Sequence, residues 1–216
     1  MAQLLLIAAV LLLASAGPLI FPAAQAGYST MPALATGVLL PTIAGLASLS
    51  ILMRKSHPAI SKVIVLGAAA GAIATVPLEV VRLIGFHYGY MPGNLPRLMG
   101  VLLLNRFAEG PSLVSDIAGW TYHFWNGASL GILFVAVFGA RRWIAPIYGM
   151  VIGIGFMLSP VVASLGVGFF GLEFSRGFPV TVLAAHLAFG GALGLLAARF
   201  LGEQSSLLWR AVSMAR

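Results

Sequence analysis

Cysteine is absent from this 216-residue sequence, and charged residues make up only 8% of it. Without cysteine the chain has no disulfide bond, no thiolate metal ligand and no catalytic thiol. Average soluble chains are about 25% charged, and a chain with so little charge could not cover a globular surface with polar groups. The shortage of charge therefore excludes soluble domains and indicates an integral membrane protein, in agreement with 60% apolar residues and a mean hydropathy of +1.03.

Acidic residues are scarcer than basic ones, with five Asp and Glu against twelve Lys and Arg and a formal net charge of +7. A positive balance is also typical of nucleic-acid binding, but the basic residues here stand at the ends of apolar runs. This distribution is the orientation signal of membrane proteins, so we expect no nucleic-acid partner. The sequence has no HExxH, GxSxG or P-loop motif, and its motifs do not decide whether the chain is an enzyme.

Six apolar segments are long enough to cross a membrane as helices. A bilayer core of about 30 Å needs roughly 20 apolar helical residues, and no segment alternates over the ~10 residues of a β-barrel strand. We expect an all-α, polytopic bundle of six transmembrane helices that forms a single membrane domain over residues 1–216. The expected spans are 3–23, 32–53, 63–86, 116–140, 144–169 and 179–201.

The first span partly resembles a secretory signal, because the apolar run Leu4–Ala14 is followed by Ala24-Gln25-Ala26, an A-x-A cleavage pattern. A secretory signal also begins with a positively charged region, and no Lys or Arg precedes this run. We therefore expect a retained transmembrane helix.

The loops differ in their content of Lys and Arg, which predicts the orientation of the chain. One side has only Arg97, Arg106 and Arg176. The other side has eight basic residues, namely Arg54, Lys55, Lys62, Arg141, Arg142, Arg199, Arg210 and Arg216. The bias predicts a multi-pass protein of the bacterial inner membrane with both termini in the cytoplasm and loops 87–115 and 170–178 outside.

The outer loop 87–115 is too long for a plain connection and is expected to contain a helix of its own. Asn94 is a suitable N-cap, and Pro96 falls in the first turn, where its missing N–H costs little. Polar residues at four-residue steps among leucines predict an amphipathic helix over about 94–108 at the outer face.

Two segments share the pattern H-x-x-x-G-x-x-x-G, at residues 123–131 and 186–194. The spans before them also correspond, since two glycines four residues apart precede a proline in 67–77 and in 149–160. The sequence thus predicts a parallel repeat of two helical hairpins, with the long outer loop inserted in the first. Small residues four apart let helices pack closely, so Gly127 and Gly190 also have a purely structural interpretation.

Ionisable residues inside a membrane are costly, and each is a candidate functional residue. Those well inside the predicted spans, away from the span ends, are Glu79, Arg82, His123 and His186. At a rise of 1.5 Å per residue, Glu79 lies roughly 12 Å below the outer surface, and each histidine roughly 10 Å below it. Three potential ligands on three helices therefore share one level.

Two imidazoles and a carboxylate at one level suit several kinds of site. His123 and His186 could hold a b-type haem between facing helices, with Gly127 and Gly190 leaving room for the ring. With Glu79 they could instead bind a divalent zinc, iron or copper ion. A structural interpretation needs no ligand: Tyr122, His123 and Asn126 would hydrogen-bond between helices, His186 would donate to a carbonyl near Pro160, and Glu79 would pair with Arg82.

The sequence thus favours a haem- or metal-binding or anchoring subunit of a larger, redox-type membrane complex involved in electron transport. The alternatives are a carrier for a small solute, a metal ion or protons that uses Glu79, and a purely structural subunit. The expected partners are the lipid bilayer and either other membrane subunits or further copies of this chain.

Overall fold

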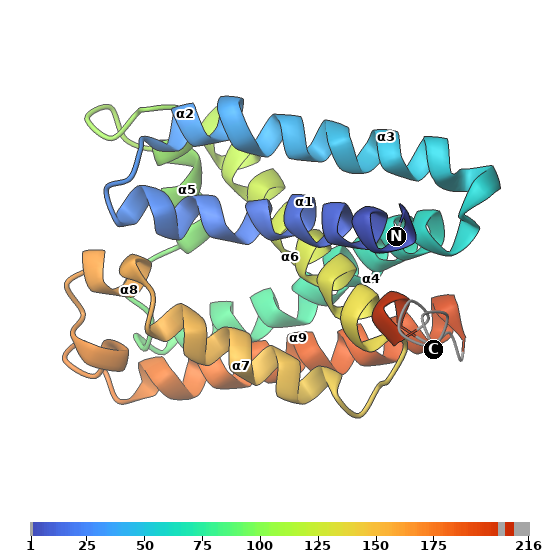
Figure 1. Ribbon diagram of the computed structural model, residues 1–216. Helices are drawn as coiled ribbons and strands as arrows, with labels where there is room; N and C mark the ends of the chain where they lie inside the picture. The colour runs from blue at the N-terminus through green and yellow to red at the C-terminus, as the bar shows by residue number, and fades with distance from the viewer. Residues whose placement is uncertain (1, 203–205, 210–216) are drawn as a thin grey trace.

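The computed structural model describes residues 2–202 and 206–209, and over these residues it is all-α, without strands (Figure 1). Five of the described helical segments are long and apolar enough to cross a membrane. They are Gln3–Gln25, Met31–Ser56, Pro58–His87, Ala145–Ser164 and Gly177–Leu201. The all-α, membrane-compatible fold expected from the sequence is confirmed.

The long segments correspond to the elements of Figure 1 as follows. The first is α1 (Ala2–Gln25), and the second joins α2 (Met31–Leu34), the π-helical turn η1 (Ala35–Leu39) and α3 (Leu40–Ser56). The third is α4 (Pro58–His87), the fourth joins α7 (Ala145–Met157) and α8 (Pro160–Ser164), and the fifth is α9 (Gly177–Leu201).

A further long helix, α6 (Leu113–Phe138), runs between the same two ends of the bundle but is not among the five apolar segments (Figure 1). It is 26 residues long, and its middle contains the polar residues His123 and Asn126. A capping box between Ser112 and Ser115 starts the helix, and Gly139, with φ of 68°, ends it.

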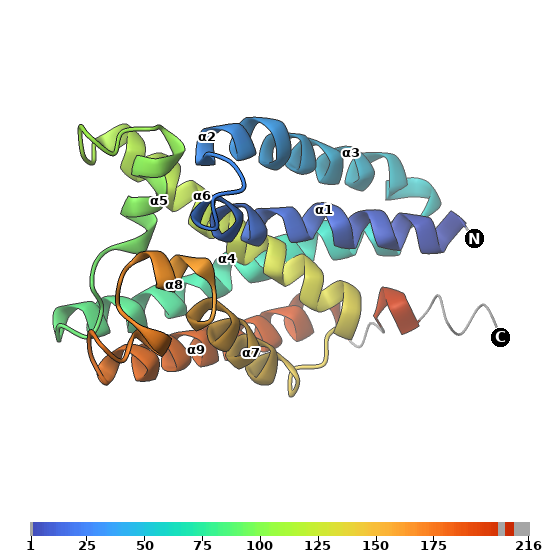
Figure 2. The same ribbon diagram turned by 60° about the vertical axis from the view of Figure 1, so that its left-hand side comes forward.

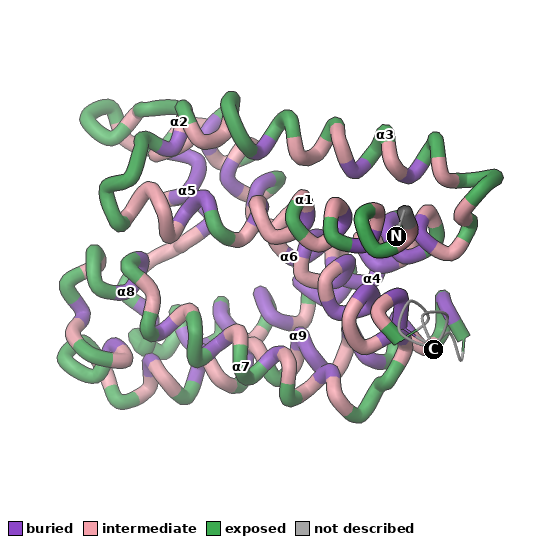
Figure 3. Tube along the Cα trace, viewed as in Figure 1, coloured by how far each residue is buried: buried purple, intermediate pink, exposed green. Residues whose placement is uncertain are grey.

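Helix α4 lies at the centre of the bundle, packed along α6 on one side and α9 on the other (Figures 1 and 2). Helix α7 packs on α9, α1 packs on α6, and α3 lies outermost. Buried residues concentrate where α4, α6 and α9 face one another, whereas exposed residues follow α3 and the outer sides of α1 and α7 (Figure 3). Many of these outward residues are large and apolar, such as Leu12 at 74% exposed and Ile51 at 73%, so the outer faces suit contact with lipid.

Close packing of α4 on α6 depends on glycines at the contact. A Cβ built on Gly71 would overlap the carbonyl oxygen of Gly127, and one on Gly131 would overlap that of Gly67. Helices α7 and α9 approach closely in the same way, at Gly149 against Gly190. The small-residue spacing seen in the sequence therefore has a packing role in both pairs.

Two expected helix boundaries were wrong for local chemical reasons. The span expected over 144–169 breaks after Met157, and Pro160 starts α8 as a separate short helix that ends at Ser164, because a proline cannot donate the hydrogen bond that would continue α7. The outer helix expected over 94–108 is shorter, and α5 (Leu95–Leu103) ends before Asn105, whose φ is +51°.

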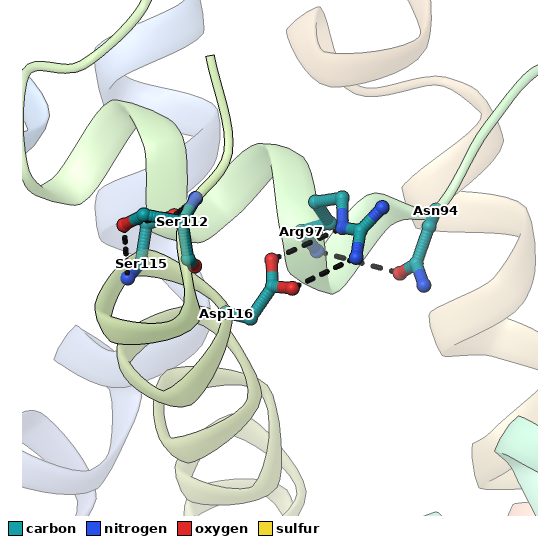
Figure 4. Close-up of polar contacts among 5 residues, drawn as sticks. All are labelled: Asn94, Arg97, Ser112, Ser115 and Asp116. Atoms are coloured by element: carbon teal, nitrogen blue, oxygen red, sulfur yellow. Dashed lines mark hydrogen bonds and ion pairs between the residues drawn. The ribbon is translucent and has the colours of Figure 1, made fainter. Parts of the chain in front are cut away.

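Helix α5 covers the end of the bundle at which α6 begins. The Asn94 side chain caps it by accepting from the backbone N–H of Arg97, as expected, and Arg97 makes a two-pronged ion pair with Asp116 of α6 at 2.8 and 3.1 Å (Figure 4). These hydrogen bonds to Asp116 raise the pKa of Arg97 above its ordinary value. A Cβ on Gly100 would overlap the carbonyl oxygen of Ser115, so α5 rests directly on the backbone of α6.

The basic loops lie at one end of the bundle. The start of α1, the α3–α4 turn, the α6–α7 loop and the end of α9 share this end, and α2, α5 and α8 lie at the other (Figures 1 and 2). Arg210 and Arg216, which the orientation count includes, lie outside the described residues.

Candidate functional site

A buried ion pair lies in the second half of α4. Glu79 and Arg82 are three residues apart, so they share one face of the helix. Both oxygens of Glu79 accept from Nε of Arg82, at 2.8 and 2.9 Å, and Nη2 of Arg82 lies 2.6 Å from Oε2. Each side chain is only 6% exposed. Two opposite charges so deep in the bundle are tolerable because each neutralises the other.

His123 of α6 meets the same carboxylate from the neighbouring helix. Its Nε2 lies 2.8 Å from Oε1 of Glu79, which is ion-pair distance but not the alignment of a hydrogen bond, since Nε2 has no hydrogen-bond partner among the described residues. The contact is possible because Gly71 and Gly127 bring the α4 and α6 backbones together one to two turns away. Glu79, Arg82 and His123 therefore form one cluster, which we call the charged cluster.

The charged cluster borders a cavity of about 430 Å³ in the middle of the bundle. This volume is within the range of about 300–1,000 Å³ found for small-molecule sites. Most of the wall is apolar and comes from α1, α4, α5, α6, α7, α8 and α9. The polar lining residues are Thr75, Arg82, His123, Asn126, Ser159 and His186.

Three residues that line this cavity each have a polar atom without a hydrogen-bond partner within the described part of the chain. These atoms are Nη1 of Arg82, Nε2 of His123 and the side-chain oxygen of Asn126, and all three are buried. A buried polar group without a partner costs roughly 1–3 kcal/mol, and more if it is charged. Native proteins contain few such groups, and all three belong to residues that line one cavity, which makes this cavity the candidate site.

His186 lines the same cavity but has different neighbours from His123. Its Nδ1 lies 2.8 Å from the carbonyl oxygen of Val182 in its own helix, and its ring stacks on Phe156 at 6.2 Å between centroids. The prediction that it donates to a carbonyl near Pro160 was wrong, because the carbonyl of Val182, one turn earlier in α9, is already within reach. The ring packs against Gly153 of α7, where a side chain would crowd it.

The remaining supporting residues separate into two groups. Asn126 and Gly127 line the cavity, as does Arg82. Tyr122 does not: its hydroxyl donates to the carbonyl oxygen of Gly17 at 2.8 Å and so ties α6 to α1. Gly190 packs against the backbone of Ala145 and Pro146 in α7.

Part of the cavity wall was not expected from the sequence. Pro18, Leu19 and Pro22 of α1 and Phe156 of α7 line it, although the first span was treated as a plain transmembrane helix. The two prolines within α1 were the available signal, because each removes a backbone hydrogen bond and breaks the regularity of a helix. Thr75 was missed too; its hydroxyl donates to the carbonyl oxygen of Gly71 at 3.0 Å.

The metal chemistry of the site is limited by its donor set. In the part of the chain that the structure describes, no group of three or more His, Asp or Glu side chains is arranged to hold a metal ion. Haem or metal binding by His123, His186 and Glu79 stays a prediction. Searches of protein-family models, of curated proteins and of solved structures find no match for this chain.

Proposed function

We propose that this protein is an integral membrane protein whose central cavity binds a small, largely apolar molecule through an oxygen atom at one end. The observation that carries the proposal is that Arg82 lines an otherwise mostly apolar cavity, while its Nη1, a charged donor, is buried without a partner among the described residues. A charged hydrogen-bond donor in such a site is expected to have an acceptor. An apolar molecule that carries an acceptor oxygen would match both the apolar lining of the cavity and the donor of Arg82.

The charge of the cluster favours a neutral ligand over an anion. Glu79 and Arg82 neutralise each other, and His123 adds a charge only if it is protonated. An anionic head group would therefore introduce an uncompensated charge into a mostly apolar cavity, at a cost of several kcal/mol. A carbonyl oxygen accepts from Arg82 without that cost. Asn126 adds a second contact, since its amide can present either a donor or an acceptor. A membrane-soluble quinone has this combination of carbonyl oxygen and apolar body.

The lipid phase is the proposed source of the ligand. Leu19 of α1 and Gly155 of α7 both line the cavity and are exposed on the outer surface of the bundle. Their exposure supports an opening of the cavity to an apolar side of the molecule between these helices. A lateral opening of this kind admits molecules that already partition into the membrane.

The proposal includes six membrane crossings, with α6 as the sixth. Helix α6 runs the length of the bundle, and its polar residues Tyr122, His123 and Asn126 face the cavity or a neighbouring helix. Both termini in the cytoplasm of a bacterial inner membrane, the parallel repeat of hairpins, and the association with other subunits or further copies belong to the same proposal. The charge bias of the loops supports the orientation.

A second candidate is haem or metal binding, favoured by the observation that His123 and His186 line one cavity. The absorption spectrum and metal content of the purified protein distinguish the two candidates. A Soret band or a stoichiometric metal that is lost in His123→Ala and His186→Ala would establish the second candidate. A protein without either, which binds a quinone analogue through Arg82, would establish the first.

A proton-coupled carrier that uses Glu79 is a variant of the first candidate, since a buried carboxylate in contact with an imidazole can exchange a proton. A purely structural role predicts that no added ligand changes the protein. The binding experiment for the first candidate therefore also tests the structural alternative.

A further inference from the structure

A second cavity lies between α3 and α4, close to the turn that joins them. It has a volume of about 490 Å³. Arg54 on α3 and Lys62 on α4 line it, and both side chains are exposed. The hydroxyls of Ser50 and Ser61 also line it and lie 3.3 Å from each other across the two helices. The cavity therefore presents two cationic groups and two hydroxyls on facing helices.

The two cations at this cavity form no ion pair with the described residues. The ion pairs among the described residues all involve Glu79, Glu109 or Asp116, and none includes Arg54 or Lys62. Arg54 and Lys62 are eight positions apart in the sequence, one on each side of the one-residue turn at His57. Their positive potentials therefore add. An anionic group is the complement of such a pocket.

The same cavity has an apolar side that a soluble anion would not use. Ile51 and Val65 line it and are 73% and 53% exposed. They lie one turn from Arg54 and Lys62, respectively, toward the middle of the bundle. A molecule with a negative head and a hydrocarbon tail matches this arrangement, because the head meets the cations while the tail lies along α3 and α4.

We propose that the α3–α4 cavity binds the head group of an anionic phospholipid. Basic pockets between helices at the membrane surface recognise such head groups. The proposal commits to a lipid rather than to free phosphate because of the exposed apolar residues beside the cations. It is independent of the function proposed for the central cavity, and it holds for either orientation of the chain.

Native mass spectrometry of the full chain in detergent tests the proposal. Phosphatidylglycerol is expected to bind at least fivefold more tightly than phosphatidylcholine of the same chain length. The variant Arg54→Gln/Lys62→Gln is expected to lose that preference. The matched control, Arg141→Gln/Arg142→Gln, removes an exposed basic pair from the α6–α7 loop, which lines neither cavity, and is expected to keep the preference.

Two further measurements keep the test decisive. Val65→Trp fills the apolar side while leaving both charges in place, and it is expected to weaken phosphatidylglycerol binding at least fivefold without lowering the melting temperature. Inorganic phosphate is expected not to displace the lipid. Equal binding of both lipids, equal effects of the two double variants, undiminished binding by Val65→Trp, or displacement by phosphate would each overturn the proposal.

Discussion

Nε2 of His123 lies 2.8 Å from Oε1 of Glu79, so a side chain of α6 reaches a carboxylate of α4 that Arg82 already neutralises. This contact joins two helices at the wall of the central cavity, and Nη1 of Arg82 has no partner within the described residues. The charged cluster therefore has a structural part, the ion pair, and a buried donor that the proposed function assigns to a ligand.

Removing one partner of the Glu79–Arg82 ion pair should destabilise the protein more than removing both partners. Arg82→Met leaves a buried carboxylate without its cation, and the expected loss is about 3–5 kcal/mol, seen as a lower melting temperature in detergent by circular dichroism. Glu79→Leu/Arg82→Met removes both charges, and most of the stability should return.

The control is an ion pair with the same spacing on the surface. Arg106 and Glu109 are three residues apart, and their side chains are 35% and 63% exposed. Arg106→Gln/Glu109→Gln should change stability by less than about 1 kcal/mol. A single variant Arg82→Met as stable as the double variant would show that the pair is not buried as described.

Helix packing at Gly71 should be intolerant of even one methyl group. Gly71→Ala would drive a Cβ into the backbone of Gly127 and Gly131, and backbone atoms cannot move aside as a side chain can. We expect a loss of about 1–3 kcal/mol in thermal unfolding, which is the usual cost of overpacking.

Gly191→Ala is the matched control, because a Cβ on this α9 glycine meets nothing within 4 Å. It should be neutral or stabilising by up to about 1 kcal/mol through helix propensity. If Gly71→Ala and Gly191→Ala have the same melting temperature, α4 and α6 do not approach as closely as described.

The sequence was sufficient to predict the long apolar helices and, as one alternative, the pairing of Glu79 with Arg82, but the predicted ligand set included His186, which is not part of the charged cluster. Helix positions follow from apolar length, and the pairing of Glu79 with Arg82 follows from their spacing of three residues. The level shared by Glu79 and His123 follows from helix rise, and the two side chains are in contact.

The cavity itself could not be predicted, because it depends on how each helix is rotated about its axis and how far it lies from its neighbours. Both His123 and His186 begin the same H-x-x-x-G-x-x-x-G pattern, yet one meets a carboxylate and the other its own backbone carbonyl. The contribution of Pro18 and Pro22 depends on the packing of α1 against α6, which brings them close to lining residues that are far away in the sequence. Only tertiary packing determines these relations.

The orientation of the chain should follow its basic residues. Because the sequence contains no cysteine, single-cysteine variants report without background. Ser56→Cys and Pro92→Cys lie at exposed positions at opposite ends of the bundle. A membrane-impermeant maleimide added to intact bacterial spheroplasts should label Pro92→Cys at once and Ser56→Cys only after lysis, because basic loops are retained in the cytoplasm. The reverse pattern would invert the proposed topology.

The most direct test of the proposed function is the affinity of the purified chain, in lipid nanodiscs, for a short-tailed benzoquinone and for a fatty acid of similar length, measured by tryptophan quenching and thermal shift. The wild type should bind the quinone more tightly than the acid. Glu79→Leu/Arg82→Met should weaken quinone binding about tenfold or more, since a hydrogen bond from a charged donor contributes roughly 1.5–3 kcal/mol. Arg106→Gln/Glu109→Gln should bind as the wild type does. Unchanged quinone affinity in the Glu79→Leu/Arg82→Met variant, or tighter binding of the acid by the wild type, would contradict the account.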